Sequence, residues 1–149
     1  MCVFCKIIKN EIPSQKVYED AFVTAFLDIN PVNPGHTLVV PNNHVADMQS
    51  ASNEDLSRMI IATKKVAKGI LKALDYKAFN LEMNNGAIAG QVVNHLHFHI
   101  VPRTEDDGLT HWPGQQYKEG EMDDVADKIK KVLKTEGAIN GVSGMKQES

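Results

Sequence analysis

Cysteine is nearly absent from this sequence, with two among 149 residues, at Cys2 and Cys5. Small secreted proteins that depend on a disulfide framework need several paired cysteines, so that class is excluded. A bridge between two positions so close in the chain would close a very small loop and stabilise little. The two remaining interpretations are a pair of free thiols and half of a metal site.

Long hydrophobic runs and an excess of charge are also absent. No apolar run approaches the length of about 20 residues that a membrane helix needs, so we expect no membrane partner. The first residues do not have the pattern of a secretion signal, and we therefore expect a cytoplasmic protein. The formal net charge of −3 gives no electrostatic reason to bind long nucleic acid. The length predicts a single domain over residues 1–137, followed by a mobile tail over 138–149.

The apolar pattern predicts an α+β fold, with an antiparallel sheet of about five strands. From Ser52 to about Asp75, apolar residues recur at intervals of three and four, as in one long amphipathic helix, and Ser52 with Asp55 resembles a capping box. A shorter helix is expected over 121–135, with Gly137 as its stop, and a short helical turn at the N-terminus. The expected strands, separated by turn residues, are 17–19, 22–28, 36–40, 78–84 and 95–101.

Three of the six histidines alternate with apolar residues in the last of these strands, which is written HLHFHIV. Successive side chains of a strand point to opposite faces, so His95, His97 and His99 share one face and the apolar residues share the other. Three interpretations follow: a metal site that needs further ligands, histidines merely exposed on a polar face, or catalysis. Catalysis suits the chemistry, because neutral imidazole is a nucleophile near pH 7 and also exchanges protons there.

These residues resemble the signature of the histidine triad family, in which histidines alternate with hydrophobic residues. The resemblance covers roughly residues 2–103, and its other segments occur in the expected order. They are FCKII at 4–8, AFLDI at 25–29, PGHTLVVP at 34–41 followed by His44, and GQ at 90–91. Beyond them, HWPG at 111–114 is similar to the nucleotide-binding (Hint) branch, and VPR at 101–103 is similar to the branch that hydrolyses dinucleoside polyphosphates.

The resemblance implies a hydrolase that cleaves a nucleoside monophosphate from its leaving group, in a phosphoramidate or an adenylylated compound, through a covalent nucleotidyl-His97 intermediate. One alternative is hydrolysis of dinucleoside polyphosphates such as diadenosine tetraphosphate. Another is a regulatory protein that binds purine nucleotides and hydrolyses them only incidentally. The family also implies a homodimer with a sheet that continues across the interface, and no organic cofactor.

The resemblance also implies roles for individual residues. His97 matches the nucleophile, His99 the residue at the phosphate and leaving group, and His36 a histidine that supports the nucleophile. The matching nucleotide-binding positions are Asp28 for the ribose, Ile29 and Phe4 for the base, and Asn84 and Gln91 for the phosphate. Val92 departs from the family, which often has a serine or threonine there, so a hydroxyl contact to the phosphate is missing.

A structural zinc site is implied by the resemblance at four positions, Cys2, Cys5, His44 and His95. Two thiolates and two imidazoles are ligands that suit structural Zn²⁺. His95 belongs both to the three alternating histidines and to this set of ligands. If it binds zinc, it cannot also be a free acid or base, and its role is then to orient the strand that carries His97.

Overall fold

The structure is a computed structural model that describes residues 1–140, the last three as backbone only. Residues 1–108 form one compact unit, and the chain from Leu109 onward forms a second. Of the predicted tail over 138–149, residues 141–149 lie outside the described part of the chain.

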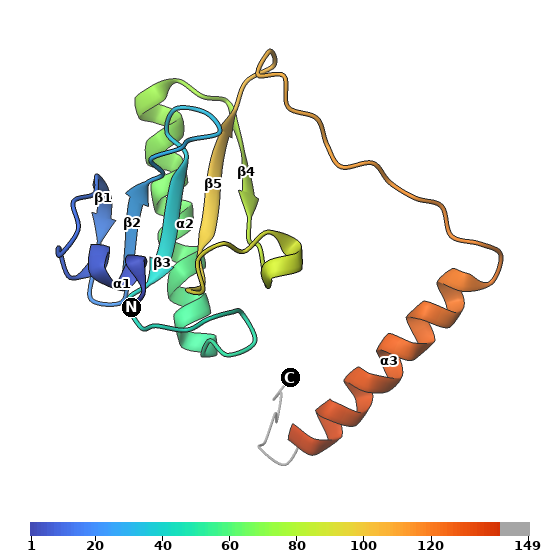
Figure 1. Cartoon of the computed structure of the whole chain (residues 1–149). Helices are drawn as coiled ribbons and strands as arrows, with labels where there is room; N and C mark the ends of the chain where they lie inside the picture. The colour runs from blue at the N-terminus through green and yellow to red at the C-terminus, as the bar shows by residue number, and fades with distance from the viewer. Residues whose placement is uncertain (141–149) are drawn as a thin grey trace, which may run out of the picture. The chain divides into compact units, whose positions relative to one another are not determined.

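The first unit is built on a five-stranded antiparallel sheet, which confirms the predicted α+β fold (Figure 1). The strands lie in the order β1-β2-β3-β5-β4, so that β5 is an inner strand and β4 is at an edge. Their bounds are β1 Lys16–Glu19, β2 Val23–Leu27, β3 Thr37–Pro41, β4 Ala78–Glu82 and β5 Phe98–Arg103. A 3₁₀ turn, η1 (Ala87–Ala89), lies between β4 and β5.

One helix covers each face of this sheet. The long helix α2 (Asn53–Leu74) packs on one face, and the short helix α1 (Val3–Ile8) packs on the other. Alternation along β3 explains the division, because Val39 joins the core beneath α2 while Leu38 and Val40 join the core beneath α1. The sheet therefore has two separate apolar cores, and the His97 ring lies on the side of α1, beside Phe4.

The strand predicted over 95–101 begins three residues later, at Phe98. The pairing of β3 with β5 sets Leu38 opposite His99, and one step along, Val39 opposite Phe98. Continued by two more residues, this register would bring Leu96 opposite Pro41, which has no N–H to donate to a ladder. The predicted alternation of faces still holds, since Leu96 packs in the core beneath α2.

Of the two longer helices, α2 begins where it was predicted to begin, and α3 (Glu121–Asn140) ends later than predicted. Helix α2 begins as expected, because the Ser52 hydroxyl accepts a hydrogen bond of 3.0 Å from the backbone N–H of Asp55. Helix α3 continues through Gly137, where the prediction had placed its end. A glycine inside a helix costs only about 1 kcal/mol relative to alanine, so it does not by itself end a helix. Among the described residues, no helix is long and apolar enough to cross a membrane.

Gly35 adopts a backbone conformation that other residues avoid, with φ of 94°, immediately before His36. We predict that Gly35→Ala lowers the free energy of unfolding by about 1–2 kcal/mol, because an L side chain is strained there. A Cβ would also lie 2.7 Å from Leu74 Cδ1, so that side chain must move. Denaturant unfolding monitored by circular dichroism measures the change.

Gly69 is the matched control, because it lies inside α2 and a Cβ there meets no atom within 4 Å. Gly69→Ala should stabilise the protein by about 0.5–1 kcal/mol. If Gly35→Ala is as stable as the unchanged protein, the strain assigned to this turn is absent.

Candidate active site

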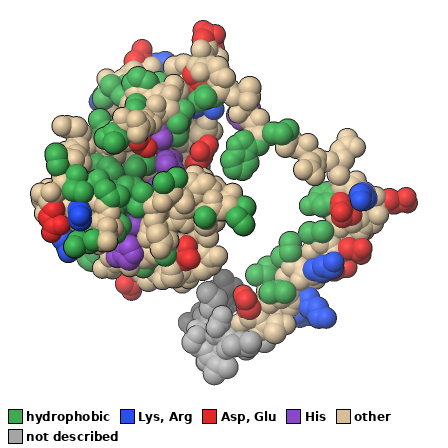
Figure 2. Space-filling model, in the orientation of Figure 1, with side chains coloured by type: hydrophobic (Ala, Val, Ile, Leu, Met, Phe, Trp, Pro, Cys, Tyr) green, Lys and Arg blue, Asp and Glu red, His purple; other side chains and the backbone are tan. Residues whose placement is uncertain are grey.

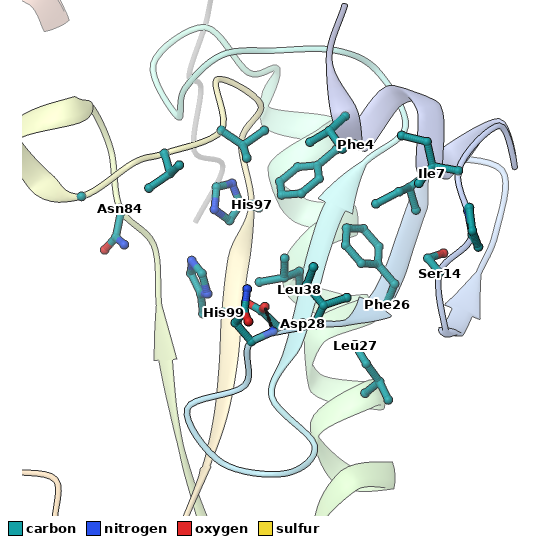
Figure 3. Close-up of a pocket in the computed structure, with 18 residues that line it drawn as sticks. Phe4, Ile7, Ser14, Phe26, Leu27, Asp28, Leu38, Asn84, His97 and His99 are labelled. Carbon is teal, nitrogen blue, oxygen red and sulfur yellow. Dashed lines mark hydrogen bonds between the residues drawn. The ribbon is translucent and has the colours of Figure 1, made fainter.

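A cleft of about 480 Å³ opens on the face of the sheet that carries α1. Its lining combines an apolar wall with polar groups at the opposite side, as Figure 3 shows. Histidine side chains reach the surface beside a broad apolar area on this face (Figure 2). A concave, largely apolar cavity with a few convergent polar groups is the usual form of a small-molecule site.

Most of the residues predicted to bind a nucleotide line this cleft. They are Phe4, Asp28, Ile29, Asn84 and Val92, together with His97 and His99. Sequence reasoning missed several apolar members of the wall, among them Ile7, Phe26 and Leu38. The alternation of β2 and β3 was the signal that could have found Phe26 and Leu38, since it sets them on the face opposite α2.

Gln91 is placed differently from the expectation that it contacts a phosphate. Its side-chain NH₂ donates to the carbonyl oxygens of Ala46 and Val93, at 2.7 and 3.1 Å. Its side-chain oxygen accepts from the backbone N–H of Gly86 at 2.8 Å. The amide therefore joins its own loop to Ala46 in the loop before α2, and Gln91 is not among the residues that line the cleft.

The contacts of His97 define which of its nitrogens carries the proton. Nδ1 lies 2.6 Å from the carbonyl oxygen of His95, and a carbonyl can only accept, so Nδ1 is the protonated nitrogen. In the neutral ring, Nε2 then has a free lone pair. Burial lowers the pKa of His97 below its usual value, although the bond to His95 and the charge of Asp28 act the other way. His97 is thus a neutral imidazole with an unprotonated nitrogen.

His99 has the opposite tautomer, which is set by His36. The Nδ1 of His36 accepts the backbone N–H of Val32 at 3.1 Å, so Nε2 of His36 carries the proton. This Nε2–H donates to Nδ1 of His99 at 2.9 Å, which leaves the His99 proton on Nε2. Burial, with the nearby His97 and His36, lowers the pKa of His99 to about 4, so His99 is neutral at pH 7. The expectation had linked His36 to the nucleophile, whereas its hydrogen bond goes to His99.

Asp28 lies at the lip of the cleft beside these histidines. One carboxylate oxygen accepts the backbone N–H of Asn30 at 2.8 Å, and the other lies 3.8 Å from Nε2 of His36. Asp28, His36 and His99 could be taken for a metal-binding trio from their proximity. The Nε2–H of His36 is already donated to His99, however, so this nitrogen has no lone pair to offer a metal, and Asp28 stands near the histidine pair at a distance too long for a hydrogen bond.

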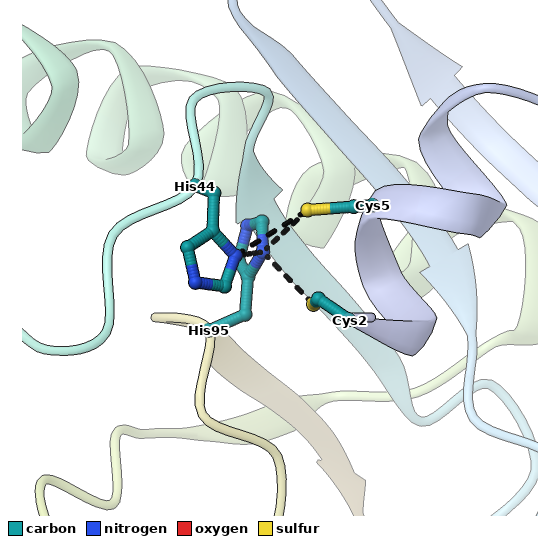
Figure 4. Close-up of side chains that lie close together, drawn as sticks. All are labelled: Cys2, Cys5, His44 and His95. Carbon is teal, nitrogen blue, oxygen red and sulfur yellow. Dashed lines mark hydrogen bonds between the residues drawn. The ribbon is translucent and has the colours of Figure 1, made fainter.

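A second cluster forms where α1 meets the loops before α2 and β5 (Figure 4). Cys2, Cys5, His44 and His95 each point one ligand atom toward a common centre, and the four atoms lie within 4.8 Å of one another. The Nδ1 atoms of the two histidines are 3.2 Å apart. Nδ1 of His95 is 3.4 Å from Cys2 Sγ and 3.6 Å from Cys5 Sγ, and Nδ1 of His44 is 3.3 Å from Cys5 Sγ.

These distances fit a tetrahedral zinc ion. Bonds of about 2.0–2.1 Å to nitrogen and about 2.3 Å to sulfur require edges near 3.3 Å between two nitrogens and near 3.6 Å between nitrogen and sulfur. The ring of His95 is also oriented for this role, since its Nε2–H donates to the carbonyl of Pro41 at 2.9 Å and leaves the Nδ1 lone pair facing the cluster. His95 therefore faces the cluster and not the cleft.

Known proteins resemble this chain in sequence over most of its length. The family model for the HIT domain matches residues 9–106. A HIT-like protein from Methanocaldococcus jannaschii is 48% identical over 130 residues, which cover 87% of this chain and 99% of that protein. An adenosine 5'-monophosphoramidase from Schizosaccharomyces pombe is 40% identical over 135 residues, covering 89% of this chain and 98% of that protein.

Solved structures also resemble this one over most of the chain. A member of the HIT family from Bacillus subtilis has a TM-score of 0.81 at 40% identity, covering 87% of this chain and 95% of that one. A zinc-bound histidine triad family protein from Mycobacterium smegmatis has a TM-score of 0.70 at 34% identity, covering 79% of this chain and 86% of that one.

Proposed function

The chain belongs to the histidine triad (HIT) family, and we propose that it hydrolyses a purine nucleoside phosphoramidate or a related adenylylated compound at the α-phosphate. The observation that carries this proposal is the pair of opposite tautomers in the cleft. His97 offers a lone pair on Nε2, and His99 offers an N–H on its own Nε2. The similarity to a protein named adenosine 5'-monophosphoramidase supports this choice of substrate class.

The reaction proceeds in two displacements. Nε2 of His97 attacks the α-phosphorus, an N–P bond forms, and the bond to the leaving group breaks with its electron pair going to the leaving atom. The Nε2–H of His99 donates a hydrogen bond where negative charge develops, on a phosphate oxygen or the leaving atom. The departing atom takes a proton from solvent. Water then attacks the nucleotidyl-His97 phosphorus, and the N–P bond breaks with its electron pair returning to Nε2 of His97. The oxygen and one proton of that water stay on the released monophosphate, and its other proton replaces the one taken from solvent.

The remaining cleft residues bind the nucleoside. The apolar wall that includes Phe4 and Ile29 accommodates the base, and the carboxylate of Asp28 accepts hydrogen bonds from the ribose hydroxyls. Asn84 lines the cleft and offers an amide to the phosphate. Val92 cannot supply a hydroxyl there, and we expect an altered preference for the leaving group as a result.

His97→Ala should lower the rate of release of AMP from adenosine 5'-phosphoramidate by at least about 10³-fold, because among the described residues that line the cleft no other histidine has a ring lone pair without a hydrogen bond. Lys72→Ala, at an exposed position of the same unit that does not line the cleft, should leave the rate unchanged. A chromatographic assay measures AMP release by the unchanged protein and by both variants. Diadenosine tetraphosphate serves as a second substrate. An alkaline quench should trap a labelled nucleotidyl adduct only when His97 is present.

Two results would contradict this proposal. If the unchanged protein binds AMP but cleaves neither compound, the protein is a nucleotide-binding module. Full activity in His97→Ala would show that another group is the nucleophile.

We also propose that Cys2, Cys5, His44 and His95 hold one structural zinc ion, on the geometry of their ligand atoms. When it is bound, zinc with four protein ligands ties chain segments together and leaves no open position for substrate. Protein purified without a chelator should contain about one zinc per chain by atomic emission, and Cys5→Ser should lose most of it. A metal-free preparation of the unchanged protein would refute the assignment.

A homodimer through β4 is the assembly that we propose. This edge strand exposes Phe79 and Leu81, beside Ile60 and Ile61 of α2, and an exposed apolar edge is a template for pairing with another chain. Leu81→Glu should convert the dimer to a monomer in sedimentation velocity. Val17→Glu, on the opposite edge strand β1, should leave the protein a dimer. If Val17→Glu gives a monomer and Leu81→Glu stays a dimer, the interface is at β1 and not at β4.

A further inference from the structure

The four-residue metal cluster and the cleft share parts of the same chain segments. Cys2 is the residue that precedes α1, and Cys5 lies inside this helix, so the two thiols flank Phe4. The Phe4 ring is buried, lines the cleft, and stands edge-on to the His97 ring with centroids 5.1 Å apart. Contacts that hold the two thiols in place therefore also hold Phe4, which is part of the cleft wall.

His95 makes a second connection between the two sites. Its ring turns Nδ1 toward the cluster and donates from Nε2 to Pro41, while its backbone carbonyl accepts the Nδ1–H of His97. The side chain of His95 thus belongs to the cluster and its carbonyl sets the tautomer of the attacking ring. A displacement of His95 would disturb the hydrogen bond that exposes the His97 lone pair.

Helix α1 depends on such contacts because it has only six residues. Isolated helices of this length are not stable in water, and the Cys2 side chain makes no capping hydrogen bond to this one. The helix is attached to the sheet by Phe4 and Ile7, which are buried in the core beneath it, and by the approach of the two thiols to His44 and His95. Loss of the thiol attachment would leave α1 held by the apolar contacts of Phe4 and Ile7 and by the hydrogen bond from Lys16 Nζ to the carbonyl oxygen of Ile8.

We propose that metal binding to the cluster and nucleotide binding to the cleft are positively coupled, with Cys2, Cys5 and His44 acting as positioning residues for Phe4 and, through His95, for His97. The coupling rests on the proposed nucleotide-binding function of the cleft. It differs from a purely structural role, in which the metal stabilises the fold but leaves the affinity of the folded cleft unchanged. Coupling between two sites is reciprocal, so each ligand must change the affinity for the other by the same factor.

The first measurement uses AMP as the probe and calorimetry as the readout. AMP should bind zinc-loaded protein about 5–150-fold more tightly than protein stripped of zinc and shown by circular dichroism to remain folded. Equal affinities in the two folded forms would overturn the coupling while the nucleotide-binding function stands. If neither form binds AMP, the proposed function fails and the coupling fails with it.

The reverse measurement tests the same coupling from the side of zinc, under conditions in which circular dichroism shows that the metal-free protein is folded. Competition with a chromophoric chelator gives the zinc affinity of the full chain with and without saturating AMP, and AMP should raise this affinity by the same factor. An unchanged zinc affinity would overturn the proposal.

Phe4→Leu is the variant that separates coupling from folding. It keeps an apolar side chain in the core and leaves all four ligands in place, so it should still bind one zinc per chain. The effect of zinc on AMP affinity should fall by several-fold in this variant, because one of the two connections is weakened. Ile12→Val is the control, since Ile12 lines the cleft outside α1, and it should keep the full effect. Equal effects in both variants would exclude Phe4 as a connection.

Discussion

The hydrogen bond from His97 Nδ1 to the carbonyl oxygen of His95 is the contact on which the chemistry of the cleft depends. It joins two residues that are nearly inaccessible to solvent, so water does not compete for either partner. Since the acceptor has no proton to give, the bond allows only one tautomer of a neutral His97 ring. The same burial lowers the pKa of His97 and favours that neutral ring.

A second chain of hydrogen bonds gives the neighbouring ring the opposite tautomer. It runs from the backbone N–H of Val32 through His36 to Nδ1 of His99, and it starts in the turn that Gly35 permits. The His97 and His99 rings, with centroids 4.9 Å apart, therefore present a lone pair and an N–H to one cleft. Displacement at phosphorus needs these two functions close together: an electron pair to attack and a donor where charge accumulates.

The sequence predicted the architecture well because periodicity reports which face of an element is buried. It predicted that His97 and His99 share a face, and both line the cleft. It could not predict the partner of His36 or the internal bonds of Gln91, because both are set by backbone groups that the fold brings close. The cysteine pair alone indicated free thiols or half of a metal site, whereas His44 and His95 came from resemblance to a family, because residues separated by about 90 positions give no local signal.

The late start of β5 is the difference that matters most for the site. Pro41 cannot donate to a ladder, and its carbonyl instead accepts Nε2–H of His95, which orients that ring toward Cys2, Cys5 and His44. Leu96 donates its backbone N–H to the carbonyl of Val45 in a loop instead of to β3. The carbonyl of His95 lies before the start of β5, and it accepts the Nδ1–H of His97. The bond that fixes the tautomer of His97 is therefore made to a residue that lies outside the strand ladder.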